Sequence, residues 1–80
     1  MPRFFFDTSD GLIMKDEEGT EFANAHLARD AAIMSLPDIA REEMIKHDSR
    51  AVVMLMRDES GRALFTASLT LTAKWLVDNA

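Results

Sequence analysis

The chain contains no cysteine, so neither disulfides nor thiolate metal sites can hold its 80 residues together. It has only three glycines and two prolines, and no linker rich in these residues divides it. We therefore expect one domain over residues 1–80. A domain of this size buries only about 60% of its surface on folding. Its stability must come from apolar packing, to which self-association could add.

Basic residues are also few and scattered. Nine lysines and arginines stand against 14 aspartates and glutamates, for a net charge of -5, and no two basic residues are adjacent. Nucleic-acid binding relies on clustered basic side chains, so we do not expect a nucleic-acid partner. No apolar run approaches the roughly 20 residues of a membrane span, and the N-terminus has no signal-peptide core. We expect an acidic, cytoplasmic protein without membrane contact.

Motifs of catalysis and cofactor binding are missing. The glycines at 11, 19 and 61 form no phosphate-binding loop, and no serine stands in a nucleophile motif. His26 and His47 have no second ligand at metal-site spacing. We predict no catalytic residue, cofactor or metal, although 14 acids leave a paired-carboxylate mechanism open.

The first half of the chain predicts a hairpin followed by an acidic loop. Residues 3–7 include three consecutive phenylalanines, and 12–14 form a second short apolar run after a Ser-Asp-Gly turn. The loop carries four carboxylates that fail the spacing of a calcium loop. We interpret them as a solvated acidic patch that could dock a basic protein: Asp16, Glu17, Glu18 and Glu21.

A helix is predicted over 24–47, with Asn24 as its N-cap. Its apolar stripe begins with Leu27, Ala31 and Met34, and Ala28, Ala32 and Leu36 widen it. Pro37 interrupts the pattern, because it cannot donate a backbone hydrogen bond and its ring clashes with the preceding turn. One kinked helix and two abutting helices both fit.

The second half predicts another hairpin. An apolar strand over 51–57 is followed by a polar turn at 58–61 and a long alternating segment from Arg62 onwards. One face of that segment carries Phe65, Ala67, Leu69, Leu71, Ala73, Trp75 and Val77. Strands of this length are uncommon, so either a bulge or break occurs near Ala73 or the end of the strand overhangs its partner.

These elements predict an α+β fold of order ββαββ, in which one helix covers one face of a four-stranded antiparallel sheet. A crossover through the helix would place the third strand beside the first, for a strand order of 2-1-3-4.

The strand over 51–57 is apolar on both faces, with Val52, Met54 and Met56 on one and Val53 and Leu55 on the other. One helix covers only one face, so we expect a second subunit on the other and a homodimer, with a foreign partner ranked second and a small ligand third. The predicted interaction surface comprises Met54, Met56, Trp75 and Val77.

An alternative hypothesis is a ligand-binding or, less favoured, catalytic site on the hydroxyl face of the last segment. That face carries Thr66, Ser68, Thr70 and Thr72. RNA binding through the sheet ranks last, because Arg3 is the only charge beside the aromatic run at 4–6.

The opening Met-Pro-Arg-Phe-Phe-Phe, the Asp-Glu-Glu-Gly loop at 16–19, the alanine-rich helix and the turn at 57–62 resemble a family of small proteins of unknown function. Members of that family occur in rhizobia and related proteobacteria. The chain departs from it at Phe5, where many members have tyrosine, and at Pro37. The resemblance implies this architecture and a bacterial cytoplasmic setting, and it implies no activity or catalytic residue.

Overall fold

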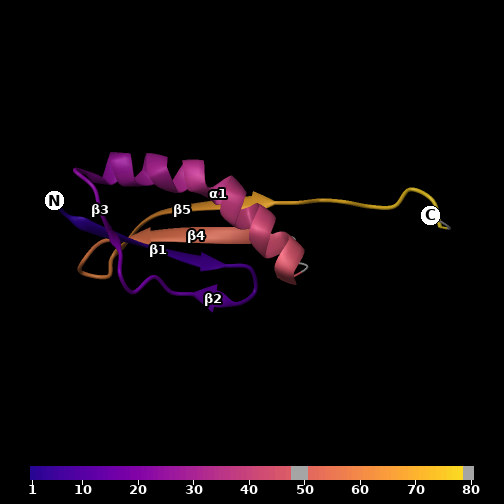
Figure 1. Ribbon diagram of the computed structural model, residues 1–80, viewed down its shortest axis with the longest axis horizontal. Helices are drawn as coiled ribbons and strands as arrows, with labels where there is room; N and C mark the ends of the chain where they lie inside the picture. Colours follow the sequence, from indigo (N-terminus) through magenta and orange to yellow (C-terminus); the bar gives the residue numbers. More distant parts are fainter. Residues whose placement is uncertain (48–50, 79–80) are drawn as a thin grey trace.

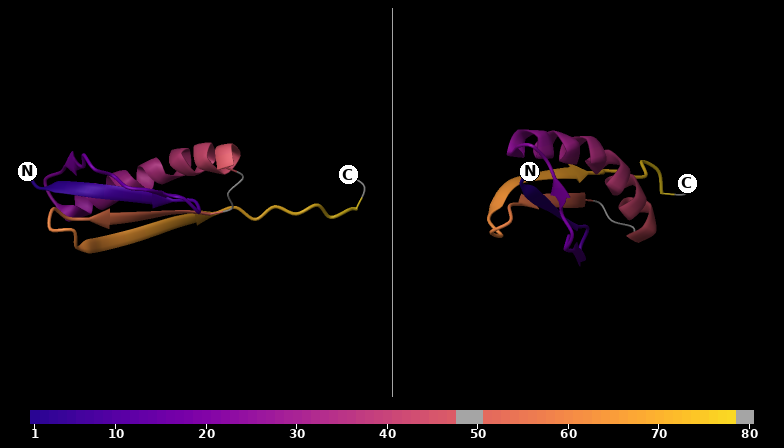
Figure 2. Two further views of the ribbon diagram at one scale, coloured as in Figure 1. Left: turned by 90° about the horizontal axis from the view of Figure 1, so that it is seen from below. Right: turned by 60° about the vertical axis from the view of Figure 1, so that its left-hand side comes forward.

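The computed structural model describes residues 1–47 and 51–78. It confirms the predicted α+β class. The strands are β1 (Arg3–Ser9), β2 (Ile13–Met14), β3 (Thr20–Glu21), β4 (Ala51–Arg57) and β5 (Ala63–Thr70), and the helix is α1 (Ala25–His47). Figure 1 shows α1 lying along the sheet, and Figure 2 shows it confined to one side.

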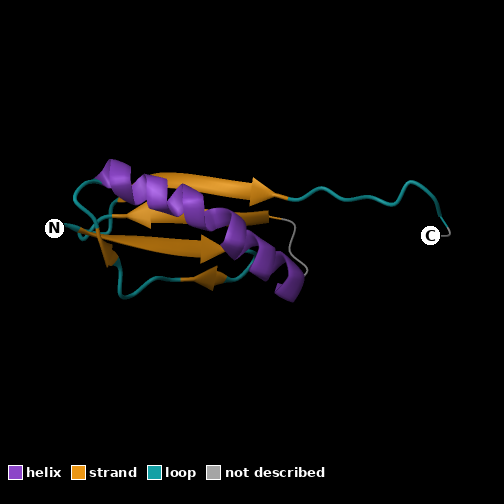
Figure 3. Ribbon diagram, turned by 45° about the horizontal axis from the view of Figure 1, so that its top comes forward, coloured by secondary structure: helices purple, strands orange, loops and turns teal. Residues whose placement is uncertain are grey.

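The sheet is antiparallel with the order β2-β1-β4-β5, which is the predicted order of the four principal strands. The additional strand β3 comes from the acidic loop and pairs with the start of β1, whereas β2 pairs with its end. Both short strands therefore lie along the same edge of β1, and β5 forms the opposite edge of the sheet (Figure 3).

The helix begins as the sequence predicts. The Asn24 side-chain oxygen accepts the Leu27 N–H at 2.9 Å, which satisfies one of the backbone donors at the helix start. The chain remains helical through Pro37, so the alternative of two helices is wrong. The helix axis changes direction about half-way along its length (Figure 1), as expected for an internal proline.

The buried line of α1 coincides with only part of the predicted stripe. It follows a strict four-residue spacing and consists of Ala28, Ala32, Leu36 and Ala40. Leu27 and Met34 are exposed instead, Met34 to 81%. Small alanine side chains let the helix approach the sheet closely, and this turns the larger neighbours outward. The core beneath this line is formed by Phe4 and Phe6 of β1, Val52, Met54 and Met56 of β4, and Phe65 and Ala67 of β5.

The chain past Thr70 leaves the sheet. Residues 71–78, called the tail below, continue in the direction of β5 and extend away from the domain (Figure 1). The tail makes the molecule long, with principal extents of 55 × 21 × 17 Å. Its radius of gyration of 15.0 Å exceeds the value of about 12 Å expected for a compact chain of 80 residues. Among the described helices, none has the length and apolar character needed to cross a membrane.

Candidate functional site

The outer edge of β5 has no strand beside it among the described residues. Its other edge pairs with β4 from Arg57↔Ala63 to Ala51↔Thr70, with a bulge opposite Met56 and Arg57. An edge strand presents backbone N–H and C=O groups that can pair with another chain. An open edge of eight residues is long for a protein of this size, so β5 is a candidate docking edge.

The tail adds apolar side chains to that edge. Ala51, the first residue of β4, lies opposite Thr70, the last residue of β5, and the tail continues past this pair. The strand β5 thus ends at Thr70, before the break or bulge predicted near Ala73, and the alternating segment does not form one strand as far as Val77. Trp75 is 78% exposed and Leu76 90%, and Leu71 and Val77 are also exposed. The tail therefore presents a large exposed apolar surface.

Two grooves run between α1 and β5. The first, of about 300 Å³, lies at the start of both elements and is lined by Ala25, His26, Arg29, Met56, Leu64 and Phe65. The second, of about 250 Å³, lies at the other end of β5 and is lined by Pro37, Ala40, Arg41, Met44, Leu69, Thr70 and Leu71. Both are mainly apolar and each has one arginine in its lining. An apolar groove therefore lies beside each end of β5.

The structure corrects the predicted interaction surface in part. Met54 and Met56 are buried beneath α1, each only 3% exposed, and contribute to the core of the chain itself. The helix covers their face of β4, so the open apolar face is the other one, which carries Val53 and Leu55. Periodicity placed the residues on two faces correctly, but it contained no signal for which face the helix would cover. Trp75 and Val77 remain accessible.

The hydroxyl row of the alternative hypothesis is divided between the sheet and the tail. Thr66 and Ser68 lie opposite Leu55 and Val53, on the sheet face that points away from the helix. Thr66 donates its hydroxyl hydrogen to the Met54 carbonyl oxygen at 3.0 Å. Thr70 is the last residue of β5, whereas Thr72 lies in the tail. Of the four residues in this row, Thr70 lines the second groove, and the other three line neither groove beside β5.

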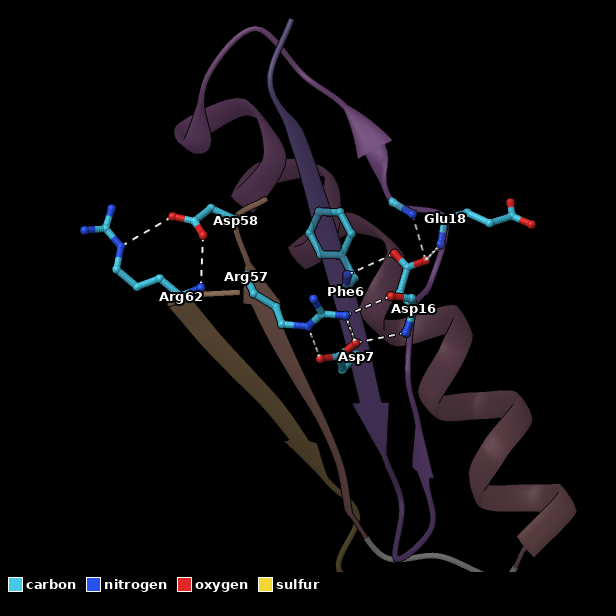
Figure 4. A network of polar contacts seen from close by, with 8 residues as sticks. Phe6, Asp7, Asp16, Glu18, Arg57, Asp58 and Arg62 are labelled. Carbon is cyan, nitrogen blue, oxygen red and sulfur yellow. Dashed lines mark hydrogen bonds and ion pairs between the residues drawn. The ribbon is translucent and has the colours of Figure 1, made fainter. Parts of the chain in front are cut away.

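The residues of the predicted acidic patch also differ from one another in burial and in hydrogen bonding. Asp16 is half-buried, and its carboxylate accepts the backbone N–H groups of Phe6 at 3.0 Å, Glu18 at 3.1 Å and Gly19 at 3.0 Å (Figure 4). The Phe6 N–H points to the gap in the β1 edge between β2 and β3, and Asp16 fills that gap. Burial of the carboxyl acts to raise the pKa of Asp16, but these three hydrogen bonds together outweigh it and lower the pKa below its usual value.

The other acidic side chains of the loop are differently placed. Arg3 forms an ion pair with Glu21 at 3.1 Å and donates to the Glu18 carbonyl oxygen at 2.9 Å. Glu17 and Glu18 are exposed. Gly19 has a φ of 71°, and a Cβ atom there would approach Arg3 Cγ to 2.8 Å. The loop is therefore a packed structural element in which Glu17 and Glu18 alone present accessible charge without an ion pair shown in the structure.

An ion pair that sequence reasoning missed joins β1 to β4. Arg57 donates two hydrogen bonds to the Asp7 carboxylate, at 2.6 and 3.1 Å, and a third to the Asp16 carbonyl oxygen at 2.8 Å (Figure 4). Its guanidinium lies 4.9 Å from the Phe5 ring centroid. The hydrogen bonds from Arg57 lower the pKa of Asp7, and those to Asp7 raise the pKa of Arg57. These hydrogen bonds tie Arg57 to Asp7 and to the backbone of Asp16, so the network holds β4, β1 and the acidic loop together.

No metal site emerges from the geometry of the described residues: no three acidic or histidine side chains converge there. His26 is placed in the lining of the first groove.

Comparison with protein families matches residues 3–70 to a domain of unknown function, DUF6894. The chain belongs to the DUF6894 family. The family match includes every strand and the helix, and it ends at the last residue of β5, so the tail lies outside it. No curated protein and no solved structure matches the chain.

Proposed function

We propose that this member of the DUF6894 family is a small acidic protein-interaction module that self-associates through the edge of β5 and the tail. The observation that carries the proposal is the tail itself, whose four exposed apolar side chains extend from an open strand edge. A long open edge with apolar side chains promotes association with another chain unless it is covered. A second copy would supply that cover.

The surface area supports this proposal. The chain exposes 5983 Å², whereas a compact monomer of 9.0 kDa exposes about 4,900 Å². The excess of about 1,100 Å² is comparable to the roughly 800 Å² that each partner buries in a stable interface of standard size. The extra surface is thus sufficient in area for a specific contact between two copies.

The acidic composition favours a basic protein as a second type of partner. A net charge of -5 favours encounters with basic proteins and disfavours nucleic acids. Glu17 and Glu18 are the exposed carboxylates of the loop that could serve such a contact. We place this module in the bacterial cytoplasm, in keeping with the family resemblance.

Light scattering across a dilution series tests self-association, with Trp75 fluorescence followed in parallel. The wild-type chain should have the mass of a dimer, and its tryptophan emission should shift to longer wavelength as dilution releases monomers. Trp75→Glu should be monomeric at every concentration, because a carboxylate would be buried without a partner. Met34→Glu is the matched control, since Met34 is equally exposed but lies on the outer face of α1.

A wild-type chain that stays monomeric with a solvent-exposed tryptophan would contradict the proposal. The same conclusion would follow if Trp75→Glu formed dimers as stable as those of Met34→Glu.

A further inference from the structure

The tail has no route back to the edge of its own β5. An antiparallel return would need a tight turn near residues 71–73, and such turns are built mostly from glycine, proline, asparagine, aspartate or serine. None of these residue types occurs between Leu69 and Val77. The tail instead continues straight out from β5 (Figure 1). The strand edge that it can reach without a turn belongs to a second copy of the chain.

Symmetry restricts how two copies can pair. Two β5 strands that extend each other's sheets antiparallel are related by a two-fold axis perpendicular to the sheet, so both helices lie on the same side. Residues directly opposite each other then share a face of the sheet. The two-fold axis must therefore pass midway between a residue of one copy and the same residue of the other copy. Each choice of that residue defines one register.

We propose that two copies pair through β5 and the tail about an axis at Thr70, so that each Trp75 occupies its partner's first groove beside the partner's Phe65. This inference rests on the proposed self-association and specifies its geometry. The resulting interface is reciprocal: each copy contributes one tail and receives the other.

In this register, side chains of similar size face each other on the helix side of the sheet. Trp75 lies opposite Phe65, Ala73 opposite Ala67, and Leu71 opposite Leu69. Phe65 lines the first groove and Leu69 the second. Trp75 and Leu71 are four residues apart, about 13 Å along a strand, as are Phe65 and Leu69. One tail therefore places a large apolar side chain at each of the two grooves at the same time.

The residue pairs on the other face of the sheet also fit the register with its axis at Thr70. Thr70 lies opposite itself, Thr72 opposite Ser68, and Lys74 opposite Thr66, so hydroxyl groups meet hydroxyl groups or an amine. Hydroxyl pairs and aromatic pairs are among the favourable cross-strand neighbours. The first groove also offers Arg29, whose guanidinium could stack on the indole of Trp75.

Neighbouring registers do not give this match. An axis at Leu69 would place Trp75 opposite Ala63, beyond the bulge of β5 and past the first groove. An axis at Ser68 would place it opposite Gly61, outside the strand. An axis at Leu71 would place Trp75 opposite Ala67, and an axis at Thr72 would place it opposite Leu69, so in neither register does Trp75 lie beside Phe65 in the first groove.

Cysteine scanning tests the register directly, because the natural chain has no cysteine. Three single variants are made at exposed residues: Ser68→Cys, Thr70→Cys and Thr72→Cys. Under mild oxidation Thr70→Cys should form disulfide-linked dimers in high yield, since facing residues have Cα atoms about 5 Å apart, close to the distance a disulfide spans. The other two should cross-link poorly alone, because their copies lie about 13 Å apart along the strands.

A mixture of the Ser68→Cys and Thr72→Cys chains should cross-link far better than either variant alone, because these two residues face each other in the mixed dimers. Efficient linkage of Ser68→Cys or Thr72→Cys alone would overturn the proposed register while leaving self-association intact. Weak linkage of all samples by chains that light scattering shows to be dimeric would also overturn it. A monomeric wild-type chain would remove the proposed function and this inference together.

Discussion

At the scale of single residues, carboxylates that the sequence presents as candidates for chemistry serve as structural connectors. Asp7 holds Arg57 across two strands, and Asp16 closes the gap between β2 and β3 along the edge of β1. The side chains of the Asp7–Arg57 pair are only about 15% exposed, so removal of one partner leaves a poorly solvated charge.

Acid should therefore destabilise the protein through these carboxylates. Hydrogen bonds lower the pKa of Asp7 and Asp16 in the folded state. Groups with a lowered folded-state pKa stabilise the fold above their unfolded pKa of about 3.9, and this contribution is lost as the pH falls through the folded-state value. Urea unfolding across this range should show a free energy of unfolding that declines below about pH 4.

Asp7→Asn supplies the comparison for that measurement. It should lower stability at neutral pH by about 2 kcal/mol, because Arg57 loses its charged partner, and should flatten the decline in acid. Glu17→Gln, at an exposed site in the same loop, should keep the wild-type slope. Equal slopes for Asp7→Asn and the wild type would show that Asp7 does not contribute to acid sensitivity.

At the scale of elements, the long periodic segments were predictable and the short ones were not. Asn24, the helix and both strands of the second hairpin follow from capping and periodicity. The strand β3 has two residues and was missed, because pairing with β1 rather than any local pattern creates it. Its backbone pairing places Thr20 opposite Phe4.

The burial and the contacts of individual side chains were harder to predict from the sequence than the elements themselves. The predicted stripe of α1 contained most of the buried line, but it also included Leu27 and Met34, which are exposed, because large apolar side chains outweigh alanines in a periodicity argument. Arg57 and Asp7 are 50 positions apart, and their contact depends on the register between β1 and β4. Burial of Met54 depends on which sheet face the helix covers, and periodicity alone does not determine that.

The N-terminus of α1 gives an element-scale prediction. Asn24→Ala should lower the free energy of unfolding by about 1 kcal/mol, because the Leu27 N–H loses its side-chain acceptor. Asn24→Ser should retain most of the stability, since serine also caps helices well. Chemical denaturation followed by circular dichroism measures both variants. A loss as large for serine as for alanine would show that Asn24 acts through something other than its cap.

At the scale of the whole molecule, two parts have different roles. The domain up to Thr70 contains the sheet, the helix and both core clusters, and the family match covers the same part of the chain. The tail adds exposed apolar surface but none of its residues belongs to either core cluster. Folding should thus depend on the domain, and association on the tail.

Removal of residues 71–80 should separate these roles. The domain that ends at Thr70 should fold with the same secondary structure by circular dichroism, because its core remains complete. The melting temperature of the full chain should rise with protein concentration, since dimerisation stabilises the folded state by mass action. That of the shortened chain should not change with concentration, and the two should converge on dilution. An unfolded shortened chain would assign the tail to the fold itself, and a concentration-dependent melting temperature without the tail would place the interface elsewhere on the domain.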